Sequence, residues 1–190
     1  MVARGQGMGM QGCRAGLAVA ILGVGLLAAC STNDPIAPIA CPQPSIPADA
    51  ADLTRYRPGP VRDLTTLEFD ARLSGLQGGC RPGRRNESIS MQLAPSFTVD
   101  RGAAAAGRTV VLPWSVAVLD ATTNEPLRPP QRFLTPVGFG PNETRTNVAG
   151  DAITIELPVS EQRRATDYRV LVFLQLTEEE LALNRRRGPR

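Results

Sequence analysis

The sequence predicts an all-β fold in which two antiparallel sheets pack face to face, followed by one short helix at the C-terminus. Two observations support this prediction. After residue 63, apolar and polar residues alternate in six segments, and this is the period of a half-buried strand. Turn residues separate these segments at short intervals, which is typical of an antiparallel sandwich. The sequence shows no internal repeat and no second domain.

The first two strands are predicted on either side of a Gly-rich turn. The segment LTTLEFDARLSGL (64–76) alternates strictly over its second half. The turn is predicted in QGGCRPGRRN (77–86), because Gly and Pro interrupt regular strands. The second strand is ESISMQLAPSFTVD (87–100), in which Pro95 indicates an edge strand or a bulge.

Four further strands and a helix complete the predicted domain. The strands are RTVVLPWSVAVLD (108–120), QRFLTPVGFG (131–140), DAITIELPV (151–159) and DYRVLVFLQL (167–176). The segment 131–140 is the weakest because Pro136 interrupts it. The helix begins after Thr177, which forms a capping box with Glu180, and its acidic first turn and arginine-rich last turn suit the helix dipole.

The N-terminus has the features of an export signal. Arg4 and Arg14 precede an apolar segment, residues 15–27, which is shorter than the ~20 residues of a membrane-spanning helix. The segment ends in LAAC, and this sequence resembles the bacterial lipobox. The resemblance implies that Cys30 is diacylated (palmitate), becomes the new N-terminus and is acylated again on its amine. The alternatives are an ordinary secretory signal and an uncleaved anchor.

The chain is therefore divided into four parts. Residues 1–29 are the predicted signal peptide, and residues 30–60 are the lipidated cysteine with a Pro-rich tether. This tether holds seven prolines, which favour an extended, semi-rigid conformation. Residues 61–177 are the predicted sandwich, with its core beginning near Leu64, and residues 178–190 are the helix with a basic tail.

Composition excludes several chemistries. The chain has no histidine, and its 21 basic residues are all arginine. The absence of histidine excludes histidine-dependent catalysis and removes the commonest metal ligand. The absence of lysine excludes Ser–Lys catalysis. Without the two arginines of the signal, 19 basic side chains stand against 18 acidic ones, so nothing indicates a nucleic-acid partner. We expect no enzyme activity, no cofactor and no metal.

Two cysteines remain after Cys30, namely Cys41 and Cys80. An exported protein meets an oxidising compartment, where such a pair is typically a disulfide. Free thiols and a metal site are the alternatives, although two cysteines without histidine make a poor zinc site. The disulfide would join the tether to the turn after the first long strand.

The arrangement ACPQPSIPADAADLTRY…GPVRDLTTLEFDARLSGLQGGCR…LPWSVAVLDA…ATDYRVLVFLQLTEEELALNRR resembles a family of uncharacterised alphaproteobacterial outer-membrane lipoproteins. The resemblance implies an immunoglobulin/fibronectin-III-like sandwich, a lipidated Cys30 and a paired Cys41 and Cys80. It implies no activity. The segment ATDYRV also resembles a tyrosine corner, in which the Tyr168 hydroxyl bonds to backbone upstream, and Trp114 is expected in the core.

Two groups of charged residues are candidate sites. Glu68 and Asp70 share a strand face, and carboxylate pairs hydrolyse glycosides, although solvated strands routinely carry such charges. The C-terminal arginines are candidate contacts for an anionic lipid such as lipid A, because arginine pairs bidentately with phosphate; a solvated helix end is the alternative. These residues are Arg185, Arg186, Arg187 and Arg190, with Arg84, Arg85, Arg163 and Arg164 as candidates to extend the cluster.

Together these observations predict a non-enzymatic lipoprotein that its N-terminal lipid anchors in the outer membrane, facing the periplasm. It would act as a scaffold or binding component of the cell envelope, with an envelope protein as partner. One alternative is a carrier that holds an apolar ligand in the sandwich, for which a cavity of ~300 Å³ or more is needed. The other is an envelope hydrolase that uses a carboxylate pair.

Overall fold

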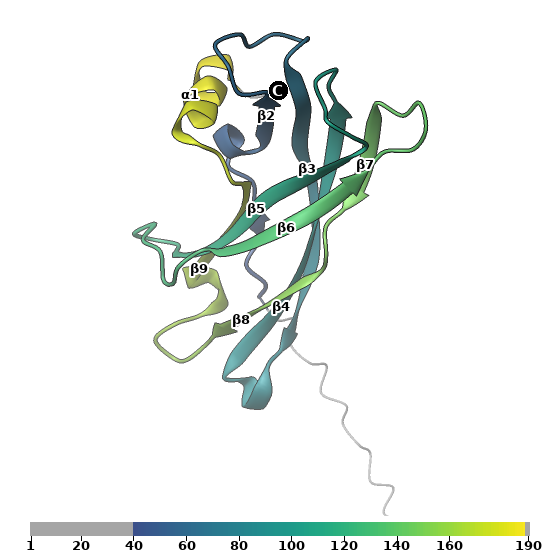
Figure 1. Ribbon diagram of the computed structural model, residues 1–190. Helices are drawn as coiled ribbons and strands as arrows, with labels where there is room; N and C mark the ends of the chain where they lie inside the picture. The colour runs from purple at the N-terminus through teal and green to yellow at the C-terminus, as the bar shows by residue number, and fades with distance from the viewer. Residues whose placement is uncertain (1–39, 189–190) are drawn as a thin grey trace, which may run out of the picture. The chain divides into compact units, whose positions relative to one another are not determined.

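The computed structural model describes residues 40–188, which form an all-β sandwich with a short C-terminal helix (Figure 1). The predicted signal peptide and Cys30 lie outside the described residues. One sheet consists of β1 (Pro44–Ser45), β9 (Tyr168–Leu174), β5 (Thr109–Asp120) and β6 (Gln131–Gly138), in that order. The other consists of β2 (Asp52–Tyr56), β3 (Leu67–Pro82), β4 (Ser88–Arg101) and β7 (Arg145–Ala149), with β8 (Ile153–Pro158) also paired to β4.

The predicted antiparallel sandwich is confirmed. Among the described strands, only β1 and β9 pair in parallel. Consecutive strands β3 and β4 pair directly over most of their length, and so do β5 and β6. The four-stranded sheet of an immunoglobulin constant domain runs A-B-E-D, so this chain has the sandwich architecture with a hairpin-rich connectivity of its own.

The core lies between the two sheets and has Trp114 among its most buried residues. Trp114 is 1% exposed, and its ring stacks on Phe133 with the centroids 4.5 Å apart. Its indole N–H donates a hydrogen bond to Thr135 Oγ1 at 3.0 Å, as a buried indole requires. The Tyr168 hydroxyl donates to the Pro158 carbonyl, as expected for a tyrosine corner.

The first long strand extends beyond its predicted end. The segment 77–86 was expected to be a turn, but β3 continues to Pro82 and pairs with β4 there. The turn is shorter and includes η2 (Arg84–Asn86). Gly78 marks a close approach between strands, because a Cβ at this position would lie 2.4 Å from the Gln92 carbonyl oxygen. Cys80 therefore lies in a strand, and its predicted place in a turn is wrong.

The sandwich begins earlier in the chain than predicted. After the short turn η1 (Ala48–Ala50), β2 pairs with β3, and Leu53 is fully buried. Leu64, which was expected to open the core, is 80% exposed. The later part of the segment 30–60, expected to be a tether, thus belongs to the folded domain.

Two prolines of the strands, Pro95 and Pro136, lie where a sheet tolerates proline. Pro95 was expected at an edge or a bulge, but β4 is a central strand with β3 on one side and β8 and β7 on the other. The Pro95 carbonyl accepts from Gly150 N–H at 2.8 Å, at the point where β4 changes partner from β8 to β7. Pro136 does not interrupt β6, which is an edge strand, and edge strands tolerate proline.

The C-terminal helix α1 (Glu178–Arg187) forms as predicted. Thr177 Oγ1 accepts from the Glu180 amide at 3.2 Å, and the Glu180 carboxylate accepts from the Thr177 amide at 2.8 Å, so the capping box is confirmed. α1 lies beside η1 and β2 (Figure 1). Within residues 40–188, no helix combines the length and the apolar character needed to cross a bilayer.

Candidate functional site

Cys41 and Cys80 form a disulfide, with their Cα atoms 5.6 Å apart. Cys41 lies just before β1 of the first sheet, and Cys80 lies in β3 of the second. Both cysteines pack against the core. The bond therefore links the two sheets at the point where the N-terminal chain enters the domain.

Of the candidate carboxylate pair, Asp70 lies in a polar row across the second sheet, and Glu68 lies two residues earlier in the same strand, β3. Asp70 accepts a hydrogen bond from Thr54 Oγ1 at 2.7 Å and stands opposite Asp100 in the register of β3 and β4. Asp100 in turn pairs with Arg145 at 2.6 Å, and this bond raises the pKa of Arg145. The favourable cross-strand pairs of this row are Thr54 with Asp70 and Arg145 with Asp100, and they offset the like charges of the two opposed aspartates. The geometry therefore favours a role for Asp70 in stabilising the sheet.

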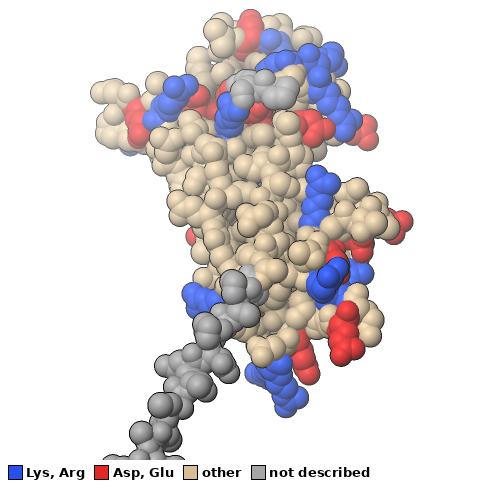
Figure 2. All heavy atoms as spheres, turned by 180° about the vertical axis from the view of Figure 1, so that it is seen from behind, with Lys and Arg blue, Asp and Glu red and all other residues tan. Residues whose placement is uncertain are grey.

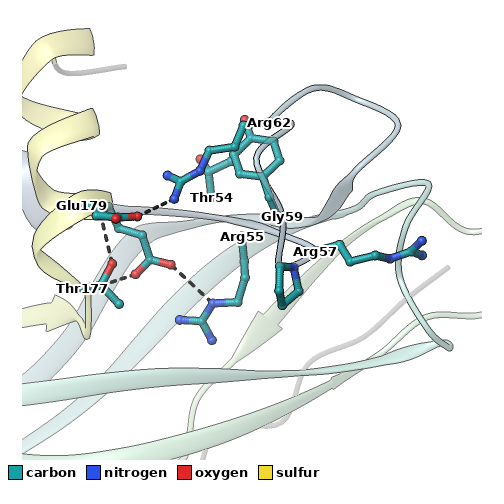
Figure 3. Close-up of a pocket in the computed structure, with 10 residues that line it drawn as sticks. Thr54, Arg55, Arg57, Gly59, Arg62, Thr177 and Glu179 are labelled. Carbon is teal, nitrogen blue, oxygen red and sulfur yellow. Dashed lines mark hydrogen bonds and ion pairs between the residues drawn. The ribbon is translucent and has the colours of Figure 1, made fainter.

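A pocket of about 260 Å³ lies between α1 and the segment that follows β2. Three arginines and two glutamates line it (Figure 3). Arg55 Nε lies 3.4 Å from Glu180 Oε1, and Arg62 pairs with Glu179. The Arg57 side chain points away from Glu179 in Figure 3 and donates to the Ala104 carbonyl at 3.2 Å.

Every charged side chain of this pocket thus has a protein partner. Arg55 also lies over the Phe69 ring, 5.6 Å from its centroid. Glu180 serves two purposes, since one carboxylate oxygen caps α1 and the other faces Arg55. The arrangement is a polar network that attaches the helix to the sandwich, and its arginines are already engaged.

The predicted arginine cluster is only partly assembled at the end of α1. Arg185 pairs with Asp49 at 3.0 Å, and Arg187 donates to Thr54 Oγ1 at 3.3 Å. Arg186 is exposed and makes no ion pair or hydrogen bond with any other described residue. Arg190 lies outside the described residues. An anion contact through these arginines stays a prediction.

The other arginines do not extend this cluster. Arg84 and Arg85 lie in η2, at the opposite end of the β3–β4 hairpin from α1, and Arg163 is in the β8–β9 connection, where it pairs with Asp120. Acidic and basic side chains are mixed at the α1 end of the face in Figure 2, while the middle of that face carries few charges. No single basic surface is formed on this face.

A second pocket, of about 380 Å³, lies between the two sheets on another side of the domain. Val118 and Tyr168 contribute from the first sheet, and Leu157 contributes from the second. Its remaining lining residues are Leu127, Arg128, Glu156, Pro158 and Arg163. Sequence reasoning missed this pocket because Arg128 and Leu127 lie in a turn of no recognisable motif.

Asp120 borders the loops of this pocket. Hydrogen bonds from the Thr122 and Thr123 amides, followed by the nearby Arg163, lower the pKa of Asp120. Its carboxylate is therefore charged at neutral pH and holds Arg163, whose Nη2 lies 3.4 Å away. Arg163 also lies over the Tyr168 ring, 5.4 Å from the centroid.

Neither metal chemistry nor similarity assigns a role to these pockets. Among residues 40–188, no three His, Cys, Asp or Glu side chains are placed to hold a metal ion. Neither a known family model, a curated protein nor a solved structure matches the chain. Function has to be argued from the chemistry of the chain itself.

Proposed function

We propose that this protein is a bacterial envelope lipoprotein, anchored through Cys30 in the outer membrane and facing the periplasm. Its sandwich serves as a non-enzymatic scaffold or binding module. The observation that carries the proposal is the LAAC motif after a short apolar segment, upstream of a domain that contains a disulfide. A disulfide suits an oxidising compartment outside the cytosol.

The arrangement of charges supports a binding module more than an enzyme. Asp70 is part of a cross-strand row, and the arginines and glutamates beside α1 are paired with one another. Glycosidases need two carboxylates on either side of a substrate site. The pocket between the sheets, in contrast, has apolar walls with a few polar groups, which is the usual character of a ligand site.

The anchor is tested by Cys30→Ser in the full chain, expressed in a Gram-negative host with a radiolabelled fatty acid. Wild type is expected to take up label and to fractionate with the outer membrane, whereas the variant takes up none. Several acyl chains are needed for stable anchoring, since each buried CH₂ contributes about 0.8 kcal/mol. Cys13→Ser is the matched control, because it changes a cysteine of the signal segment and is expected to label normally.

Two outcomes would contradict the proposal: an unlabelled wild type, or a Cys30→Ser variant that still takes up label. Because an uncleaved variant would stay in the inner membrane through its apolar segment, gel mobility is read beside fractionation; the precursor is 29 residues longer than a chain that begins at Cys30. A Cys41–Cys80 disulfide that shifts the band on reduction shows that the variant is folded.

A further inference from the structure

The pocket between the sheets contains two arginines that are incompletely paired. It opens where the β5–β6 loop (121–130) and the β8–β9 loop (159–167) leave the sandwich on the same side in Figure 1. Arg128 comes from the first loop and Arg163 from the second. Both therefore line a recess whose other lining residues are mostly apolar, with Glu156 as the remaining charged one.

Each arginine uses only part of its guanidinium group. Arg128 Nη1 donates to the Glu156 backbone carbonyl at 3.4 Å, and Arg163 Nη2 faces Asp120 at 3.4 Å. The remaining terminal nitrogens, Arg128 Nη2 and Arg163 Nη1, are buried and have no hydrogen-bond partner among the described residues. Buried polar groups in proteins nearly always have a partner, and a charged donor without one costs free energy.

The acidic residues nearby do not accept a hydrogen bond from either of these two nitrogens. Glu156 alternates with the buried Ile155 and Leu157 along β8, so its side chain belongs to the outer face of the sheet.

The Glu156 carboxylate accepts instead from Ser88 Oγ at 3.2 Å. Asp120 directs one carboxylate oxygen at the Thr122 and Thr123 amides and the other at Arg163 Nη2. Two cationic donors in the wall of this pocket thus lack an acceptor in the described chain, and because both nitrogens are occluded, a ligand reaches them only after the guanidinium groups shift.

We propose that this pocket binds a small aliphatic carboxylate. The hydrocarbon chain lies against Val118, Leu127 and Leu157, and the carboxylate accepts hydrogen bonds from Arg128 and Arg163. Guanidinium and carboxylate are planar and match each other in geometry, and a volume of about 380 Å³ falls in the range of small-molecule sites. The inference rests on the proposed binding role and is independent of the anchor at Cys30.

The test is equilibrium dialysis of the full chain against radiolabelled octanoate, with octanamide as a neutral probe of nearly the same shape. Protein from membranes is reconstituted in phosphatidylcholine nanodiscs, with empty nanodiscs subtracted; protein that proves soluble is used directly. We expect saturable binding of one octanoate per chain and at least about tenfold weaker competition by octanamide, since a charge-assisted hydrogen bond is lost. The octanoate-binding result can therefore be interpreted even if Cys30 proves not to be lipidated.

Substitutions distinguish the contribution of the two arginines from that of the apolar wall of the pocket. Arg128→Gln and Arg163→Gln are each expected to weaken octanoate binding about tenfold or more, without changing the weak binding of octanamide. Leu127→Ala, at a side chain that is 41% exposed, is expected to weaken both probes equally. Arg132→Gln is the matched control, because this exposed arginine of β6 does not line the pocket.

Three results would overturn the proposal. They are no saturable octanoate binding by wild type, equal affinity for octanoate and octanamide, or unchanged octanoate affinity in Arg128→Gln. Arg128 is the decisive position, because its only hydrogen bond within the described chain is the long one to the Glu156 carbonyl. A thermal unfolding midpoint equal to that of wild type checks that each variant is folded.

Discussion

Trp114 shows how a single residue can organise the centre of this sandwich. Its ring contacts Phe133, stacked at 4.5 Å, and Phe97, tilted at 6.2 Å between centroids. The indole N–H is satisfied by Thr135 Oγ1, a hydroxyl that is itself buried. The hydrogen bond permits a large aromatic group to be buried completely without leaving a polar atom unpaired.

Thr135→Val is expected to lower the free energy of unfolding by about 1–3 kcal/mol, because it leaves the buried indole N–H without an acceptor. The measurement is urea denaturation followed by tryptophan fluorescence, which reports on Trp114 alone because it is the single tryptophan. Thr154→Val changes an exposed threonine of β8 and should leave stability nearly unaltered. Equal midpoints for Thr135→Val and wild type would show that the hydrogen bond is unimportant.

Residues in regular patterns could be predicted from the sequence. Trp114 lies on the apolar face of an alternating strand, and Thr177 with Glu180 has a spacing that only a helix start explains. Arg128 could not be found in this way, and Arg163 was singled out only as a candidate to extend the C-terminal arginine cluster, which it does not join. Their chemical role depends on which nitrogens the fold buries, and loop sequence carries no signal for that.

The helix α1 is held to the sandwich mainly by polar contacts. Asn184, which is 7% exposed, donates to the Asp49 carbonyl at 3.0 Å and to the Asp52 carbonyl at 2.7 Å. The arginine–carboxylate pairs that α1 makes are more exposed, such as Arg62 with Glu179, and exposed pairs contribute little. Asn184 is therefore expected to be the main attachment point.

Asn184→Ala is expected to reduce stability by about 1–3 kcal/mol, since two backbone carbonyls lose a buried donor. Alanine is the better helix former, so the loss cannot come from helix propensity. Hydrogen exchange of the α1 amides is the direct measurement, with faster exchange predicted for the variant. Arg186→Ala, at an exposed residue without a partner in the described chain, is the control; equal protection of α1 in both variants would contradict this account.

Elements with strong alternation were predictable, and elements with weak alternation were not. β7 was missed because Val148 is the one residue of this strand that packs against the core. β2 was missed because Leu53 stands among polar residues, two of which, Asp52 and Thr54, are buried. The early end predicted for β3 followed from Gly78 and Gly79, although Gly78 lies within the strand, where it permits close contact with β4.

At the scale of the whole domain, the Cys41–Cys80 disulfide joins the N-terminal entry of the chain to a long central hairpin. β1 has only two residues and pairs with β9 alone. Such a short pairing would hold the entry of the chain weakly. The disulfide connects this entry to β3, which has 16 residues and is paired on both sides. If Cys30 is the anchor, this bond fixes the domain to its tether.

The double variant Cys41→Ser/Cys80→Ser is expected to lower the free energy of unfolding by about 4 kcal/mol. The two cysteines are 39 residues apart, and closing a loop of this size restricts the unfolded chain by that amount in the chain-entropy model. Urea denaturation of the full chain is the measurement, with wild type compared before and after reduction by dithiothreitol. Reduced wild type and the double variant should share one midpoint, because both lack the same crosslink while most of the core is unchanged. A reduced wild type as stable as the oxidised protein would contradict a crosslinking role for this pair.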